Sequence, residues 1–178
     1  MLLPLKDDNP TRIIPYVTFT LIGLNLLGFL MELQAPGFEA QRKLILSMGA
    51  IPVRFFYETR VPDFFLPTWM TIFTCLFLHA GWLHLGSNLL YLWIFGNNVE
   101  EYLGHGRFAI FYLLCGVAGT WGHMLLNPSS QIPLIGASGA IAGILGAYLV
   151  LYPRHQVLCL LFLFIIVQMI RLPAIWVL

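Results

Sequence analysis

Long apolar stretches with almost no charge constrain this chain more than any other feature. Residues 13–33 form a nearly uncharged run. A run of about 20 apolar residues is long enough to cross the hydrocarbon layer of a bilayer as a helix. Since hydrophobic residues make up 59% of the chain and charged residues only 10%, we expect a multi-pass integral membrane protein, in contact with the lipid bilayer. We also expect it to reside in the plasma (inner) membrane, although the composition does not determine which membrane holds it.

Further apolar runs alternate with short polar connections along the chain. We expect them to form membrane-embedded helices over residues 13–33, 82–99, 108–126, 137–152 and 156–170. Residues 34–67 are rich in proline and charge, and they predict a long extramembrane loop with short helices. The loop and its border carry aromatic residues that suit the headgroup region, namely Phe55, Phe56, Tyr57, Phe64, Phe65 and Trp69. Such a loop either rests on lipid or forms a lateral entrance for a membrane substrate.

The distribution of charge and cysteine excludes several classes of function. Nine basic and eight acidic residues are dispersed along the loops, so no basic patch could follow the phosphates of a nucleic acid. Cys75, Cys115 and Cys159 lie in apolar stretches, and their spacing fits no metal site. We therefore expect packing roles for the thiols and no disulfide, metal, cofactor or nucleic-acid partner.

One serine, Ser138, lies among glycines and alanines at the start of the short apolar helix over 137–152. That helix would be about 24 Å long at 1.5 Å per residue, less than the roughly 30 Å of the hydrocarbon layer. The loop 127–136 must therefore dip into the membrane, where non-helical backbone survives only if it is buried in protein or lines a water-filled cavity. Ser138 would then lie below the membrane surface and still meet water.

Two rows of small residues run along the serine helix at intervals of four. Rows of this kind let neighbouring membrane helices approach closely; they are Ser138, Ala142, Gly146 and, beside them, Gly139, Gly143, Ala147. A serine in such a row usually serves packing alone. The motif Gly-x-Ser-Gly also differs from the hydrolase elbow Gly-x-Ser-x-Gly, which follows a strand. Packing and catalysis therefore both remain open for the serine.

A second polar group opens the helix over 82–99. His84 and Asn88 are four residues apart and share one helix face. Polar groups inside a membrane face the bundle interior or a cavity and by default mark a functional site, although both could simply bond to neighbouring helices. His79 precedes the helix and fits a role in tethering the loop. Glu100 and the residues after it predict a structural polar turn, in which Gly104 ends the helix.

Together these motifs resemble the rhomboid family of intramembrane serine proteases. The resemblance covers nearly the whole chain and rests on His79-x-x-x-x-His84-x-x-x-Asn88, Glu100 with Gly104, and Gly136-Ala-Ser138-Gly139. It implies an all-α membrane protein, a rhomboid-like helical bundle with five of the usual six transmembrane helices. Residues 1–178 would then be a single rhomboid-like domain that lacks the last helix.

The same resemblance implies a site and a substrate class. Ser138 would be the nucleophile, in a motif completed by Gly136 and Gly139. His84 and Asn88, with the backbone N–H of Ser138, would bind the oxyanion. The substrates would be single-span membrane proteins, cut within or near the transmembrane segment by a metal-free serine-histidine dyad.

Two departures from the family pattern stand out. Met70 follows Trp69 where the family usually has Trp-Arg, which concerns a structural contact. The family's general base is a histidine in a Gly-x-x-x-His segment, and none of the five histidines here matches it. We therefore expect a piece of a longer protein, inactive by itself, since a serine hydroxyl without a base is a poor nucleophile. A non-catalytic rhomboid-like protein that binds transmembrane helices is the main alternative, and a channel or transporter is a distant third.

Overall fold

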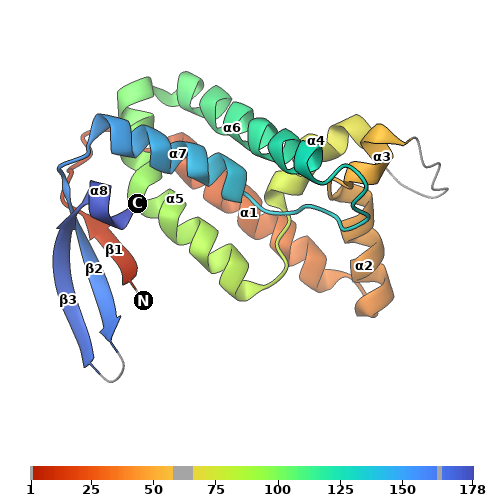
Figure 1. Ribbon diagram of the computed structural model, residues 1–178, viewed down its shortest axis with the longest axis horizontal. Coiled ribbons are helices and arrows are strands. Elements are labelled where there is room, and N and C mark those ends of the chain that lie inside the picture. Colours follow the sequence, from red (N-terminus) through yellow and green to blue (C-terminus); the bar gives the residue numbers. More distant parts are fainter. Residues whose placement is uncertain (1, 58–65, 164–165) are drawn as a thin grey trace.

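The computed structural model describes residues 2–57, 66–163 and 166–178, and it is a helical bundle with a small sheet at one end (Figure 1). The bundle consists of α1 (Tyr16–Gln34), α5 (Trp82–Leu103), α6 (His105–Leu126) and α7 (Ser138–Leu151). Short helices gather at the end away from the sheet: α2 (Gly37–Met48), α3 (Pro52–Phe56), η1 (Thr68–Met70), α4 (Thr71–Thr74) and η2 (Cys75–Phe77). The sheet end consists of β1 (Leu2–Asp7), β2 (Gln156–Leu163), β3 (Ile166–Pro173) and α8 (Ala174–Val177).

Helices α1 and α6 each bury one stripe and expose apolar side chains elsewhere. The buried residues of α1 recur every three or four positions, as Thr18, Leu21, Asn25, Phe29 and Glu32. In the most apolar 18-residue windows of α1 and α6, only 28% and 22% of the residues are buried. A core helix of a soluble protein would bury most of such a window. By length and composition α1 and α6 can each cross a membrane.

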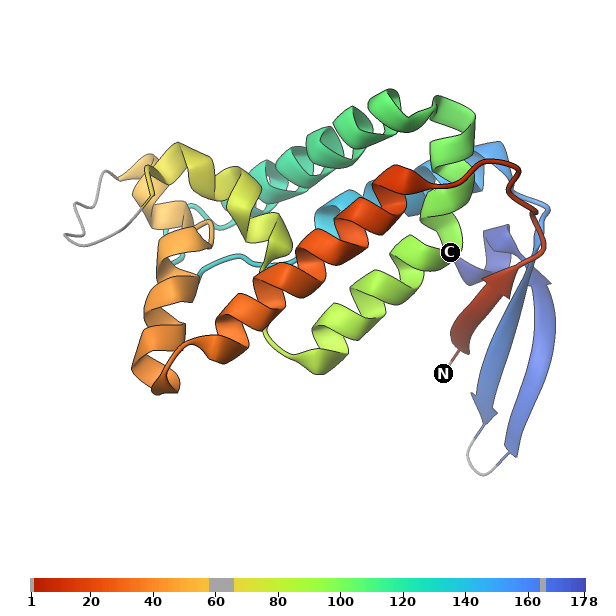
Figure 2. The same ribbon diagram turned by 180° about the vertical axis from the view of Figure 1, so that it is seen from behind.

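Helix α7 lies between α5 and α6, as Figure 1 shows, whereas α1 runs along the opposite side of α5, in front in Figure 2. The expected helices over 13–33, 82–99, 108–126 and 137–152 thus all exist, with ends shifted by a few residues. At 14 residues, α7 is about 21 Å long. The serine helix is therefore as short as its sequence indicates, and its first residue is Ser138.

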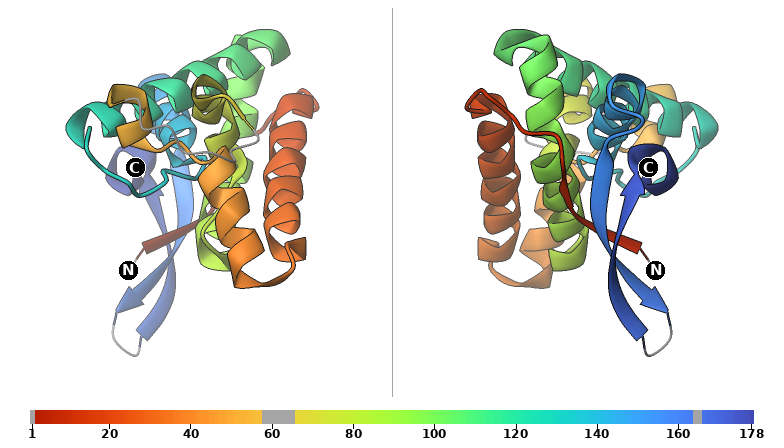
Figure 3. Two further views of the ribbon diagram at one scale, coloured as in Figure 1. Left: turned by 90° about the vertical axis from the view of Figure 1, so that its right-hand side faces the viewer. Right: turned by 90° about the vertical axis from the view of Figure 1, so that its left-hand side faces the viewer.

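The expected helix over 156–170 is wrong, because this segment forms strands. Strands β2 and β3 pair antiparallel from Gln156↔Pro173 to Leu163↔Ile166, and β1 pairs antiparallel with β2, giving the order β1-β2-β3. Figure 3 shows the sheet projecting from the bundle. An uninterrupted apolar run has no period that distinguishes a strand from a buried helix. Val157, Val167 and Ile170 are β-branched and favour the extended form, so the protein is not all-α.

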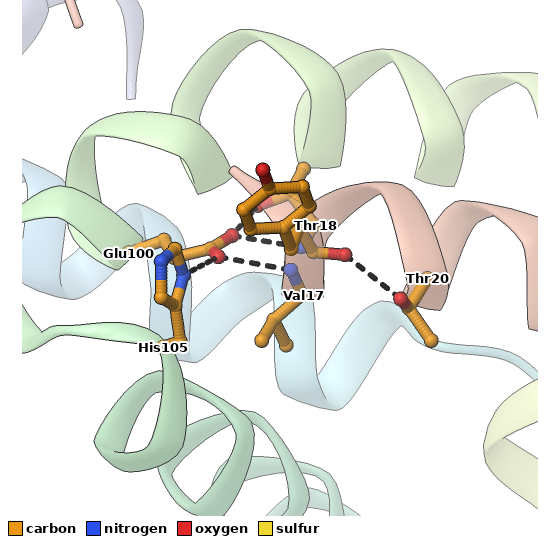
Figure 4. Close-up of polar contacts among 6 residues, drawn as sticks. Val17, Thr18, Thr20, Glu100 and His105 are labelled. Carbon is orange, nitrogen blue, oxygen red and sulfur yellow. Dashed lines mark hydrogen bonds and ion pairs between the residues drawn. The ribbon is translucent and has the colours of Figure 1, made fainter. Parts of the chain in front are cut away.

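A buried carboxylate ties the start of α1 to the end of α5 (Figure 4). Glu100 accepts hydrogen bonds from the N–H of Val17 (2.9 Å), the N–H of Thr18 (2.7 Å) and the hydroxyl of Thr18 (2.6 Å). The His105 ring lies 2.6 Å from the same carboxylate. Helix α1 has no side-chain cap of its own, so Glu100 satisfies N–H groups that lack intrahelical partners. Gly104, at φ +77°, ends α5. The predicted structural turn is confirmed.

We expect Glu100→Gln to lower the free energy of unfolding by about 2–4 kcal/mol. The buried donors of Val17 and Thr18 would lose a charged acceptor, and one of them would face the N–H of the new glutamine amide. Unfolding in detergent, followed by circular dichroism, measures the change. The control is Glu101→Gln, since Glu101 accepts its bond from the Arg12 N–H at the surface and should change stability by less than about 0.5 kcal/mol. Equal stability of the two variants would contradict the assigned role of Glu100.

Candidate active site

The first two turns of α5 present two polar side chains to the loop that precedes α7. Asn88 is buried and His84 is half-buried. A Cβ atom placed on Gly136 would lie 2.7 Å from both Cε1 and Nε2 of His84 and 3.7 Å from Nδ2 of Asn88. Both side chains therefore lie against the backbone two residues before Ser138. The structure thus brings His84 and Asn88 of α5 to Gly136, the first residue of the Gly-x-Ser-Gly motif.

Both groups offer an N–H at this place. The Ala80 N–H donates to Nδ1 of His84 at 3.4 Å, so the neutral ring carries its proton on Nε2, the nitrogen beside Gly136. Asn88 Nδ2 is buried and has no acceptor within the described ranges. A buried donor without a partner costs about 1–3 kcal/mol and is uncommon in native proteins. The arrangement is therefore suited to an acceptor that binds at the Gly136 backbone.

Gly136 is required here for two reasons. Its φ of +118° is a conformation that side chains rarely tolerate, and the position of a Cβ atom is occupied by the His84 ring. Its N–H donates to the Cys75 carbonyl of η2 at 2.8 Å. The glycine thus lets the loop backbone reach both His84 and η2.

The rest of the loop is held by backbone pairs with the α2–α3 junction. Leu134 and Ala50 exchange two backbone hydrogen bonds of 2.8 and 3.1 Å, and the Val53 N–H donates to the Ser130 carbonyl at 3.1 Å. Non-helical backbone at membrane depth needs such internal partners. The backbone of Ser130 and Leu134 thus finds hydrogen-bond partners within the protein, as a loop at that depth would require.

The two small-residue rows of α7 have different surroundings. On one row, a Cβ atom on Gly119 of α6 would come within 2.9 Å of Gly139 Cα, and a Cβ atom on Gly143 would collide with Cys115 of α6. Helices α6 and α7 therefore meet backbone to backbone. The other row is exposed, comprising Ser138, Ala142 and Gly146. In the described ranges, the Ser138 hydroxyl forms no hydrogen bond to a histidine.

A residue that the sequence analysis did not single out lies close to this site. Glu32, in the last turn of α1, accepts a 2.8 Å hydrogen bond from the backbone N–H of His79. This bond joins the segment before α5 to α1 through the backbone, so the tethering role predicted for the His79 side chain stays a prediction. As the only charge of an otherwise apolar span, Glu32 carried a signal in the sequence, because such residues are usually functional.

The aromatic residues predicted to rest on lipid divide into two groups. Phe55 and Phe56 of α3 pack against Trp121 of α6, with ring centroids 5.9 and 6.3 Å apart. Tyr57 and Trp69 are exposed, while Phe64 and Phe65 lie outside the described residues. Two of the loop aromatics thus anchor the loop to the bundle. The described ranges hold no group of three or more potential metal ligands.

Comparison with known proteins gives one consistent family. Residues 67–178 match the family profile described as Rhomboid domain. The chain is 33% identical over 135 residues to Rhomboid protease GluP of Bacillus subtilis, which covers 76% of this chain and 24% of that protein. It is 36% identical over 138 residues to Putative rhomboid protease YdcA of the same organism, covering 78% of this chain and 63% of the relative.

A plant protein adds a third match. Rhomboid-like protein 11, chloroplastic, of Arabidopsis thaliana is 34% identical over 106 residues, covering 57% of this chain and 38% of that protein. The matched region thus spans between 24% and 63% of the length of these three relatives.

Proposed function

Because the chain belongs to the rhomboid family, whose members are embedded in membranes, we propose that it is an intramembrane serine endopeptidase with Ser138 as nucleophile. The observation that carries the proposal is the pair of N–H donors, on His84 and Asn88, that lie against Gly136 two residues before the serine. If His84 and Asn88 served packing alone, the Asn88 Nδ2 group would be expected to have a hydrogen-bond acceptor.

The chemistry follows from these positions. When the Ser138 hydroxyl attacks a peptide carbonyl, the carbonyl oxygen gains negative charge. The donors available to it are Nε2–H of His84, Nδ2–H of Asn88 and the backbone N–H of Ser138, which has no intrahelical partner at the first position of α7. Each fixed donor of this kind is worth about 10²–10³ in rate. The positive end of the α7 dipole adds to the same effect.

The proposed general base is a histidine on an apolar segment that packs on the exposed row of α7. Ala142 and Gly146 leave the helix surface flat there, and a Cβ atom on Gly146 would meet nothing within 4 Å. A helix could approach this row as closely as α6 approaches the other one. Residues 1–178 would then form one rhomboid-like domain that this further transmembrane helix completes.

The proposed substrates are single-span membrane proteins, which could reach the exposed Ser138 from within the bilayer. The plasma membrane stays a prediction, because one relative bears the name chloroplastic. A rhomboid-like protein that binds transmembrane helices without cutting them is the alternative. The unpartnered Asn88 donor and the His84 tautomer favour the enzyme, since helix capture has no use for donors placed beside a serine.

The test is labelling of Ser138 by a serine-directed fluorophosphonate in membranes, using residues 1–178 with and without the genomic continuation. We expect stoichiometric labelling only with the continuation, because the base activates the hydroxyl. The control is Ser138→Ala, which should remove the label. Equal labelling of the short chain would show that a histidine within it, such as His84 or His123, is the base. No labelling of either chain would favour the binding protein.

A further inference from the structure

A buried carboxylate lies behind the candidate site and has no part in the chemistry described so far. Glu32 is 1% exposed, and only its Oε1 atom has a partner, the His79 N–H at 2.8 Å. Its Oε2 atom is buried without a partner in the described ranges. Burial of a carboxylate with so few hydrogen bonds is costly. Packing alone does not explain why a buried carboxylate with one unpartnered oxygen is present at this position.

The residue that Glu32 holds is in direct contact with His84. The His79 ring is buried and packs edge-on against the His84 ring, with centroids 5.0 Å apart and an interplanar angle of 67°. Both ring nitrogens of His79 lack partners in the described part of the chain. No hydrogen bond joins the two rings in these ranges, so the His79 ring is in edge-on contact with the His84 ring.

The next residue touches His84 from another direction. The Ala80 N–H donates to Nδ1 of His84, and this bond leaves the ring proton on Nε2 beside Gly136. Residues 79 and 80 thus contact the His84 ring from two directions, His79 through its ring and Ala80 through its N–H. Since they belong to the non-helical connection between η2 and α5, the bond from His79 to Glu32 fixes a segment that no helix holds.

We propose that Glu32 is a positioning residue for His84, acting through the backbone of His79. The path runs from Glu32 to His79 and Ala80, then to the His84 ring, and ends at the Gly136 backbone. Without the carboxylate, the segment would shift and the His84 Nε2–H would leave its place beside Gly136. A displacement of about 1 Å at a reacting group can cost about 10²-fold in rate. The catalytic consequence rests on the proposed function, whereas the effect on the His84 ring does not.

The first test reads the His84 tautomer directly on residues 1–178. Imidazole nitrogen NMR of the chain in detergent should show one Nε2–H tautomer for His84. Glu32→Gln keeps an acceptor for the His79 N–H and should preserve that spectrum, whereas Glu32→Leu should give a mixture of tautomers. Thermal unfolding checks that both variants are folded. An unchanged His84 spectrum in folded Glu32→Leu would overturn the proposal. If Glu32→Leu does not fold, loss of the single tautomer in Glu32→Gln would overturn it as well.

The second test is kinetic and uses the chain with its continuation. Glu32→Leu should lower kcat by about 10–100-fold with KM changed by less than about twofold, and Glu32→Gln should restore most of the rate. In a His84→Ala background Glu32→Leu should cost nothing further, but in an Asn88→Ala background it should keep its full effect. An equal loss in both backgrounds would contradict action through His84. Ser138-independent cleavage would instead refute the proposed function and leave the NMR result to decide the role of Glu32.

Discussion

Replacing Ser138 with alanine is expected to lower cleavage of a transmembrane substrate by about 10⁶-fold in the chain with its continuation, to the level left by binding and oxyanion donors. The reason is that the hydroxyl is the proposed nucleophile, at the exposed first position of α7. Substrate cleavage in proteoliposomes, followed on gels, measures the loss.

A second serine offers a matched control for this prediction. The Ser87 hydroxyl donates to the His84 carbonyl within α5 at 3.0 Å, so Ser87→Ala removes a hydroxyl close to the site without touching the nucleophile. We expect a rate within about threefold of the wild type, since surface substitutions change little. Full cleavage by Ser138→Ala would refute the assignment of the nucleophile.

Replacing Gly136 with alanine should have the second largest effect, about 10⁴-fold. The new Cβ atom would lie 2.7 Å from Cε1 and Nε2 of His84, and the φ of +118° would add backbone strain. The clash moves the backbone away from both His84 and Asn88, and each displaced donor costs about 10²–10³. Steady-state cleavage rates in detergent measure the effect.

Three further variants make the Gly136 prediction specific. His84→Ala and Asn88→Ala should each lower kcat by about one to three decades with a smaller change in KM, so that together they approach the effect of Gly136→Ala. Gly86 lies between them on α5, and a Cβ atom added there would meet nothing within 4 Å. Gly86→Ala should therefore leave the rate within about twofold of the wild type. Wild-type activity in Gly136→Ala would show that catalysis does not depend on the position of the His84 ring beside Gly136.

The sequence predicted the features that depend on the length of apolar runs and on the position of single polar or glycine residues. The four bundle helices follow from long apolar runs, and the helix-ending role of Gly104 follows from its place after the polar residues that close α5. The proximity of His84 and Asn88 to Ser138 could be expected only through the family resemblance. No spacing in a single sequence reports that residues 84 and 136 meet, because that contact depends on how α5 and the loop before α7 pack.

Three features could not be predicted, for different physical reasons. The hairpin of β2 and β3 was missed because an apolar run such as Val157 to Leu163 offers no alternation. The choice between the two rows of α7 was open because both have the same spacing of small residues. It is resolved by contacts of Gly139 and Gly143 with α6. Glu32 was missed because a single charge near the end of a span also suits the membrane surface.

The antiparallel pairing of β1 with β2 joins two segments that are far apart in the sequence, with Leu2 opposite Leu161. During synthesis on a ribosome, all four long helices emerge before β2 does, so β1 has no strand partner while they assemble. Closing a loop of this size adds little thermodynamic cost, since that cost grows only with the logarithm of length, but such distant contacts form slowly. Asp7 can meet Asn98 and then Tyr148, both of which donate to its carboxylate, before any strand pairs. We therefore expect the helices to assemble first, the N-terminal anchor at Asp7 second and the sheet last.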